Sequence, residues 1–133
     1  MLTFVRHIIR VAQAAKHERD KAVARSPHWR TCEKHFLADH ATCAACGGTK
    51  RLQVHHEQPF HSHPELELDP NNLIALCMGP HECHIRIGHG DSFHFFNPHV
   101  VRDARETLEH PERRSAIEAR AKAARLVNEP GDA

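Results

Sequence analysis

The sequence is poor in aromatic side chains, and this limits the core that it can build from apolar burial alone. Only 5% of its 133 residues are aromatic, and tyrosine is absent. A chain of this length is enough for one compact domain and too short for two ordinary ones. Small domains with a thin core usually draw added stability from disulfides or a structural metal. We therefore expect one domain with support of that kind.

Long apolar runs are also lacking, which excludes a membrane-spanning helix. Nothing approaches the roughly 20 consecutive apolar residues that a span needs, and charged residues interrupt the N-terminal segment throughout. We expect a protein that is not exported and stays in the cytoplasm, where thiols remain reduced. Its 5 cysteines are an odd number, which argues against a complete disulfide framework. Together with 15 histidines they favour metal binding.

Net charge is only +1, but its distribution along the chain is uneven. The first 54 residues hold ten lysines and arginines against four acidic residues, whereas acidic residues are in excess in the remainder. A basic half is typical of a phosphate-facing surface, although a solvated face without a partner fits the charge equally well. The candidates for DNA contact are Arg30, Lys34, Lys50, Arg51 and Arg86.

The pattern of apolar residues predicts helical flanks around a broken central segment. Residues 2–25 have helical spacing, and Ser26-Pro27 is typical of an N-cap and first turn for a helix reaching His40. Asn97-Pro98 and Pro111 predict two further helices at the C-terminus. Between the flanks, glycines and prolines leave two short strands, at 52–55 and 73–76. We divide the chain into a flank at 1–41, a core at 42–97 and a flank at 98–133.

Four of the cysteines have a spacing typical of a structural zinc site. Cys43 and Cys46 are separated by two residues and followed by Gly-Gly, so one tight turn can present two sulfurs to a single ion. Cys77 and Cys83 are separated by five residues, with Gly-Pro between them to form a turn. Unrelated thiols are the alternative, but we expect one Zn²⁺ on all four. The fifth, Cys32, follows the apolar stripe of its helix and is expected to be a buried thiol.

Two adjacent histidines on the first predicted strand suggest a reacting centre. Neighbouring residues of a strand point to opposite faces, so His55 can bind a metal while His56 performs a separate task. Phosphodiester hydrolysis needs such a division, because water must be deprotonated while a cation neutralises charge developing on the phosphate. Asn72 and His84 follow in the other predicted elements.

Taken in order, these motifs resemble those of the HNH endonuclease family. The resemblance covers about residues 29–103 and rests on CxxC at 43–46, VHHEQPF at 54–60, LDPNNLIALC at 68–77 and CHIRIGHG at 83–90. It implies an α+β fold with a small ββα-metal core, also called a His-Me finger, beside a four-cysteine zinc knuckle. It also implies metal-dependent cleavage of DNA, with contacts mostly to the phosphate backbone.

The resemblance assigns a role to each matching residue. His56 stands at the position of the general base, and Asn72 at that of the asparagine that braces the loop and helps to orient this base. His55 and His84 match ligands of the catalytic ion, which we expect to be Mg²⁺, Mn²⁺ or Ni²⁺. Cys43, Cys46, Cys77 and Cys83 match the structural zinc ligands of many members.

The third catalytic ligand departs from the family pattern. Some members place two histidines four apart on a helix, which stacks them on one face. Here His84 and His89 are five apart, or roughly 140° around an α-helix. Either Gly88 ends the helix and lets His89 turn back, or the ion has two protein ligands and completes its shell with water and phosphate. We favour the second arrangement, with His89 near the phosphate.

The sequence leaves the biological setting and one alternative function open. Small HNH proteins resemble those of phages and mobile elements, and a double-strand cut would call for a homodimer, a larger complex or two visits. The alternative is a zinc-ribbon module that binds nucleic acid without cutting it. That module needs the cysteines and the basic half, but it has no use for His55, His56, Asn72 and His84 at family spacing. An exported toxin is disfavoured, because we find no region for export or receptor binding.

Overall fold

The computed structural model describes residues 24–128 and has the α+β architecture expected from the sequence. Its centre is an antiparallel pair of strands, β1 (Leu52–His56) and β2 (Leu73–Cys77). The α-helices of the described part are α2 (Trp29–Asp39), α3 (Val100–Glu109) and α4 (Arg114–Asn128). Short turns complete the order: the 3₁₀ turns η1 (Pro64–Leu66), η2 (Pro70–Asn72) and η4 (Pro111–Arg113), and the π-helical turn η3 (His84–Gly88).

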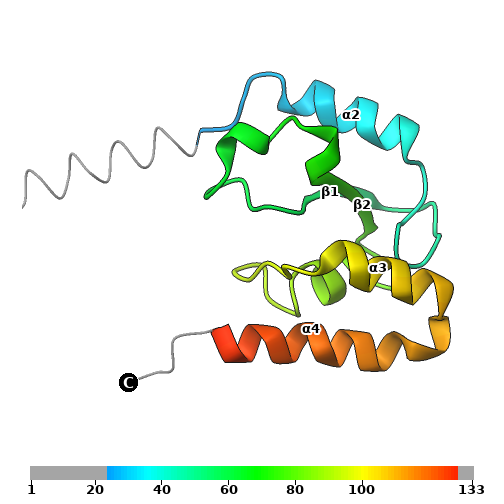
Figure 1. Cartoon of the computed structure of the whole chain (residues 1–133). Coiled ribbons are helices and arrows are strands. Elements are labelled where there is room, and N and C mark those ends of the chain that lie inside the picture. The colour runs from blue at the N-terminus through cyan, green and yellow to red at the C-terminus, as the bar shows by residue number, and fades with distance from the viewer. Residues whose placement is uncertain (1–23, 129–133) are drawn as a thin grey trace, which may run out of the picture.

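The two-stranded sheet lies between helices (Figure 1). Helix α2 covers one face, while α3 and α4 lie beyond the other face. The π-helical turn η3 fills the space on this second side and contacts both strands and both C-terminal helices. No helix within residues 24–128 is long and apolar enough to cross a bilayer.

The strands turn alternate side chains to the two sides of the sheet. In the antiparallel register, His55 pairs with Ile74 and His56 pairs with Leu73. Ile74 belongs to the apolar cluster on the η3 side, whereas Leu73 belongs to the cluster under α2. The alternation expected for the His55-His56 pair is therefore present, because successive strand residues face opposite ways.

Each face of the sheet has its own apolar cluster. On the α2 side, Phe36 packs with apolar residues of both strands. On the other side, the cluster joins β2 to η3 and α3, and three of its members are cysteines. Its buried residues are Cys43, Ala45, Ile74, Leu76, Cys77, Cys83, Ile87, Val100 and Ala104. Few large side chains contribute to either cluster, in keeping with the small aromatic content of the sequence.

The predicted helix starts require correction at two positions. Ser26 is not the N-cap of α2, which begins at Trp29; its hydroxyl instead accepts a hydrogen bond from the His28 amide at 3.1 Å. Asn97 likewise accepts from the His99 amide at 2.9 Å, and α3 begins at Val100. In both cases the side-chain oxygen accepts from the backbone amide two residues later. This small turn competes with capping of the helix by the same side chain. The helix predicted over 2–25 lies outside the described residues, except for its last two positions, which are not helical.

A buried carboxylate fastens the C-terminal helices to η3. Asp103 on α3 is 1% exposed, and it accepts hydrogen bonds from Asn97 at 2.8 Å and from Arg120 on α4 at 2.6 Å. Asn97 also donates to the carbonyl of Ile87, inside η3, at 2.9 Å. Buried charges are tolerated when they are paired and hydrogen-bonded, as this one is. The C-terminal flank therefore acts as a brace for η3.

Candidate metal centres

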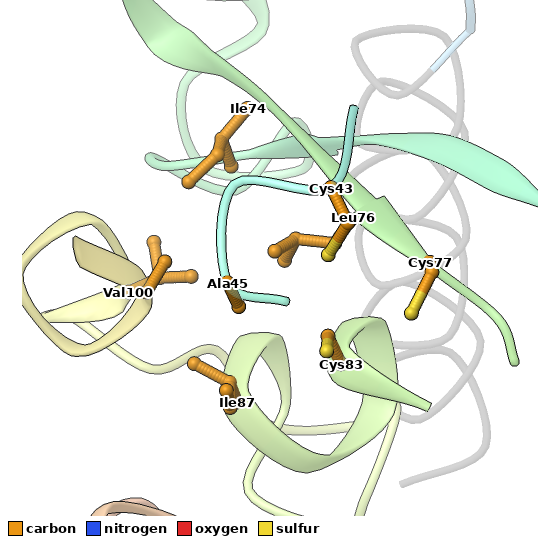
Figure 2. Packing of buried hydrophobic residues seen from close by; sticks show 9 residues of the cluster. Cys43, Ala45, Ile74, Leu76, Cys77, Cys83, Ile87 and Val100 are labelled. Atoms are coloured by element: carbon orange, nitrogen blue, oxygen red, sulfur yellow. The ribbon is translucent and has the colours of Figure 1, made fainter. Parts of the chain in front are cut away.

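Four cysteines from three separate segments converge on the η3 side of the sheet. Cys43 and Cys46 lie in the loop before β1, Cys77 ends β2, and Cys83 immediately precedes η3. Their sulfur atoms lie within 4.8 Å of one another, and all four thiols are free. Figure 2 shows the sulfurs of Cys43, Cys77 and Cys83 directed toward a common centre, with Leu76 and Ile87 beside them. We refer to these four residues as the cysteine cluster.

The spacing of the sulfurs fits a tetrahedral metal site. Cys46 Sγ and Cys77 Sγ are 3.7 Å apart. Two sulfurs bonded to one Zn²⁺ at about 2.3 Å with tetrahedral geometry would be about 3.8 Å apart. A hydrogen bond with Cys83 lowers the pKa of the Cys43 thiol to about 4, although burial opposes this shift. The same hydrogen bond raises the pKa of the Cys83 thiol, and burial raises the pKa of the Cys46 thiol. The metal-free cluster therefore favours a thiolate at Cys43, and a metal ion would displace the remaining thiol protons on binding.

The loop that carries the first two cysteines has the backbone form expected of a zinc knuckle. Gly47 has a positive φ of 73° and donates its amide to the Cys43 carbonyl at 2.8 Å. The next amide, that of Gly48, points to Cys46 Sγ at 3.4 Å. Glycine adopts this left-handed conformation without steric cost, so the Gly-Gly pair lets the chain turn tightly around the sulfurs.

Three histidines form a second cluster, which we call the histidine cluster: His55 on β1, His84 at the start of η3 and His89 just after it. Their ring nitrogens lie within 4.8 Å of one another, and all three residues are buried. The Nε2 atoms of His84 and His89 are 3.2 Å apart. Two nitrogens bonded to one ion at 2.0–2.1 Å with tetrahedral geometry would be separated by about 3.3 Å.

The π-helical form of η3 explains how His89 joins this cluster. An α-helix continuing through His89 would point that residue elsewhere, but η3 ends at Gly88, which agrees with the first of the two arrangements that the sequence left open. Residues 84–88 form a π-helical turn, whose i→i+5 hydrogen bonding widens the turn and brings residues five apart closer to the same side than in an α-helix. His84 and His89 therefore face each other, and the reason for preferring an ion with two protein ligands disappears. Single π-helical turns are frequent at functional sites.

The hydrogen bonds behind the histidines leave their Nε2 lone pairs unsatisfied. His84 donates from Nδ1 to the Gln53 side-chain oxygen at 3.1 Å, and His89 donates from Nδ1 to the Phe95 carbonyl at 2.7 Å. A neutral imidazole has one proton, so Nε2 of each ring is an acceptor. His55 Nε2 is also buried and has no hydrogen-bond partner. The facing Nε2 acceptors of His84 and His89 repel each other without a donor between them, and a cation there would satisfy both, with a ring nitrogen of His55 within 4.8 Å as a third ligand.

The pKa values of these histidines favour the neutral form that metals require. Burial, reinforced by the neighbouring His89 and His84, lowers the pKa of His55 well below its ordinary value. Burial and His89 lower the pKa of His84 to about 4. Burial also lowers the pKa of His89, although its bond to the Phe95 carbonyl opposes this. All three rings are therefore neutral at pH 7 and can offer lone pairs to an ion.

Three supports of the histidine cluster were not predicted. Gly88 leaves room for the His55 ring, because a Cβ there would lie 3.1 Å from His55 Nδ1. Gln53 lies two residues before His55 and so on the same face of β1, a signal that was available in the sequence. The Phe95 contact uses a backbone carbonyl, which no side-chain pattern reveals.

His56 lies on the opposite face of β1, held between a ring and a carbonyl. Its Nε2 bonds to the Glu67 backbone oxygen at 3.0 Å, and its ring lies 4.7 Å from that of Trp29 at a tilt of 30°. Because the carbonyl can only accept, the proton resides on Nε2 and Nδ1 keeps its lone pair. Burial lowers the pKa of His56, while the Glu67 bond opposes this shift. A neutral His56 can accept a proton.

Asn72 braces the loop that supplies this carbonyl. Its side-chain amide donates to the carbonyls of Gln58 and Leu66, both at 3.2 Å, and its oxygen accepts from the Gln58 amide at 2.7 Å. The contact with Leu66 is one residue from Glu67. Asn72 thus links Gln58 to Leu66 within this loop and so restrains the neighbouring Glu67 carbonyl that orients His56.

The predicted DNA-contact residues are exposed but do not form one surface. Arg30 and Lys34 lie on α2, on one side of the sheet (Figure 1), and Lys50 and Arg51 lie just before β1. Arg86 lies in η3 on the other side, where it pairs with Glu82 at 2.9 Å and Glu118 at 3.8 Å. Its charge is therefore partly neutralised by neighbours.

The remaining candidates from the sequence occupy less central positions. Cys32 is partly buried, 3.8 Å from the Leu68 carbonyl, and takes no part in the cysteine cluster. His61 and His81 are exposed, and His63 is partly buried. Phe93 and Phe96 lie beside the histidine cluster, with ring centres 4.8 Å and 5.0 Å from that of His89. Phe93 is 50% exposed and forms part of the surface around the site.

The chain was compared with known proteins at three levels. No family model, no curated protein and no solved structure matches it.

Replacing His89 with alanine is expected to weaken divalent-metal binding at the histidine cluster. Loss of a partner behind a ligand typically costs 10- to 100-fold in metal affinity, so loss of the ligand itself should cost at least roughly that much. Titration calorimetry with Ni²⁺, on protein whose cysteine cluster already holds zinc, measures the change. His94→Ala is the matched control, because His94 is exposed and outside the cluster. An unchanged Kd for His89→Ala would exclude His89 as a ligand.

Proposed function

We propose that this chain is a metal-dependent DNA endonuclease of the HNH type. One observation carries the proposal: ring nitrogens of three buried histidines lie within 4.8 Å of one another beside β1, and the next residue of that strand is a neutral histidine held by a carbonyl. A metal site and a proton acceptor on adjacent residues are the two functions that phosphodiester hydrolysis requires. The order of the motifs along the sequence agrees with this assignment.

The histidine cluster would hold the catalytic divalent ion through His55, His84 and His89. The donor set fits, since all three rings are neutral and the closest nitrogens have a spacing suited to one ion. Imidazole ligands suit Ni²⁺ and Zn²⁺, and Mg²⁺ or Mn²⁺ would need added oxygen ligands. When bound, such an ion supplies positive charge that stabilises the phosphate and the departing oxygen. Gln53 and the Phe95 carbonyl keep the imidazole rings oriented toward it.

His56 would act as the general base. Its Nε2 proton is committed to the Glu67 carbonyl, which leaves Nδ1 to accept a proton from the attacking water. Trp29 and the loop braced by Asn72 restrict the motion of the ring. Holding a base in its reactive orientation removes an entropic cost from the reaction. Asn72 is thus a positioning residue that acts through Glu67.

The cysteine cluster would hold a structural Zn²⁺. Four ligands and a closed, mostly buried environment are typical of structural sites, whereas catalytic zinc sites keep an open position. The cluster joins the loop before β1, the end of β2 and the residue before η3, and so links β1 and η3, the elements that carry His55 and His84. Zinc would therefore fix the relative positions of the two strands and η3.

DNA is the substrate that we propose, bound mainly through its phosphates. Arg30, Lys34, Lys50 and Arg51 are exposed, and we propose that they contact the phosphate backbone. Phosphate contacts carry little sequence information, so we expect cleavage with weak sequence preference. A single site cuts one strand, and a double-strand break would require a dimer, a larger assembly or two successive events.

The test is cleavage of supercoiled and linear DNA with Mg²⁺, Mn²⁺, Ni²⁺ or Zn²⁺, with zinc retained in the cysteine cluster. We expect nicked circles to appear before linear product, and excess EDTA to stop the reaction. His94→Ala, which replaces a histidine outside the cluster, should cleave DNA at the wild-type rate. Tight DNA binding without cleavage under any of these metals would instead favour the zinc-ribbon binding module.

A further inference from the structure

Arg114 makes a contact with the cysteine cluster that the proposed function does not use. Its Nη1 and Nη2 atoms both lie 3.3 Å from Cys83 Sγ, within hydrogen-bond reach of sulfur. Nη2 also donates to the His81 carbonyl at 2.7 Å. Arg114 is the first residue of α4, so its guanidinium links the start of this helix to the loop before η3.

An ion pair with Glu118 also holds the side chain of Arg114 in this position. Its Nε lies 2.7 Å from Glu118 Oε1, one helical turn further along α4. The side chain is only 20% exposed, so the contact with Cys83 is shielded from most of the solvent. A planar guanidinium anchored through Nε presents its two terminal nitrogens in a fixed direction. Here both terminal nitrogens are directed to one sulfur.

The positive charge of Arg114 faces a cluster that is negatively charged when it holds zinc. Four thiolates around one Zn²⁺ have a net charge of about −2, which is costly to keep in a largely buried site. Among the described residues, the nitrogen hydrogen bonds to the sulfurs of Cys43 and Cys46 come from backbone amides, such as that of Gly48. Cys83 is the position where a positive side chain meets the cluster. Hydrogen bonds behind a ligand commonly adjust the affinity of a metal site.

We propose that Arg114 is a positioning residue of the cysteine cluster, which stabilises the metal-bound Cys83 thiolate and so retains the metal. This inference rests on the proposed zinc site, but it does not depend on nuclease activity. It also gives α4 a direct connection to η3, because Cys83 is followed immediately by His84 in the chain. The alternative is that Arg114 serves only to pack α4 through Glu118.

The experiment uses full-length protein with Co²⁺ in the cysteine cluster. Sulfur-to-cobalt charge-transfer absorption reports on thiolate ligands alone, so an ion in the histidine cluster does not contribute. The bands are recorded first, and their decay after addition of excess EDTA gives the rate of metal release. Arg114→Gln is expected to shift the bands and to release metal roughly 10- to 100-fold faster. Arg114→Lys, which keeps the charge but lacks the planar fork, should fall between this variant and wild type.

Glu118→Gln is the matched control, because it removes the ion pair of Arg114 and leaves the contact with Cys83 possible. A role in helix packing alone predicts similar effects for Arg114→Gln and Glu118→Gln on thermal stability, with the absorption bands unchanged. The inference is overturned if Arg114→Gln releases cobalt within twofold of the wild-type rate. If Arg114→Gln does not fold, Arg114→Lys decides by the same criterion. If wild-type protein shows no thiolate bands, the zinc site fails as well.

Discussion

Replacing His56 with alanine is expected to lower the rate of DNA cleavage by about 10²- to 10⁴-fold, the usual contribution of a general base. The physical reason lies in the contacts of His56: the Glu67 carbonyl fixes its proton on Nε2, and burial keeps the ring neutral, so Nδ1 is free to accept a proton. Single-turnover nicking of supercoiled plasmid, at saturating protein and metal, measures the chemical step directly.

Metal content separates this role from a structural one. His56 lies on the opposite face of β1 from the histidine cluster, so His56→Ala should retain both metals. His35→Ala is the matched control, because His35 is an exposed histidine on α2. Cleavage by His56→Ala at the wild-type rate, with metals bound, would show that another group activates the water.

Replacing Cys77 with serine is expected to abolish zinc binding at the cysteine cluster and to unfold much of the domain. Three of the four cysteines belong to the apolar cluster that joins β2, η3 and α3, and few large side chains are available to replace the metal. Binding of structural zinc is worth about 10–16 kcal/mol in small domains, which is comparable to the whole stability of such a fold. Thermal unfolding followed by circular dichroism, with zinc measured on the same samples, tests this.

Cys32→Ser is the matched control for this change. Cys32 is partly buried but lies outside the cluster, so its replacement should alter the free energy of unfolding by less than about 1 kcal/mol and leave zinc content unchanged. The prediction is contradicted if Cys77→Ser lacks zinc and yet unfolds cooperatively at the wild-type temperature. In that case, packing of β2 against η3 would be sufficient without a metal.

The sequence alone determined those features that depend on short spacings. Gly-Gly after Cys46 predicted a tight turn around the sulfurs, and the structure has that turn with Gly47 at positive φ. Strand alternation predicted that His55 and His56 face apart, and their pairing with Ile74 and Leu73 agrees. These predictions succeed because a turn or a strand fixes side-chain direction within a few residues.

Only the tertiary structure decided the position of His89. Spacing alone placed His84 and His89 on different sides of an α-helix, because the widening of η3 is not encoded in the pattern of apolar residues. The π-helical turn is instead held by contacts from distant segments: Asn97 bonds to the Ile87 carbonyl, and α3 and α4 pack against the turn. Such tertiary contacts override the intrinsic helix propensity of these residues, and they come from segments distant in the sequence.

Backbone carbonyls and distant charges were likewise beyond the reach of the sequence. The Glu67 and Phe95 carbonyls orient His56 and His89, and Arg114 approaches Cys83 from 31 positions further along the chain. A carbonyl is present at every residue, so the sequence does not indicate which one is used. Residue types and short spacings determined which ligands are available, whereas packing between distant segments decided how they are aimed.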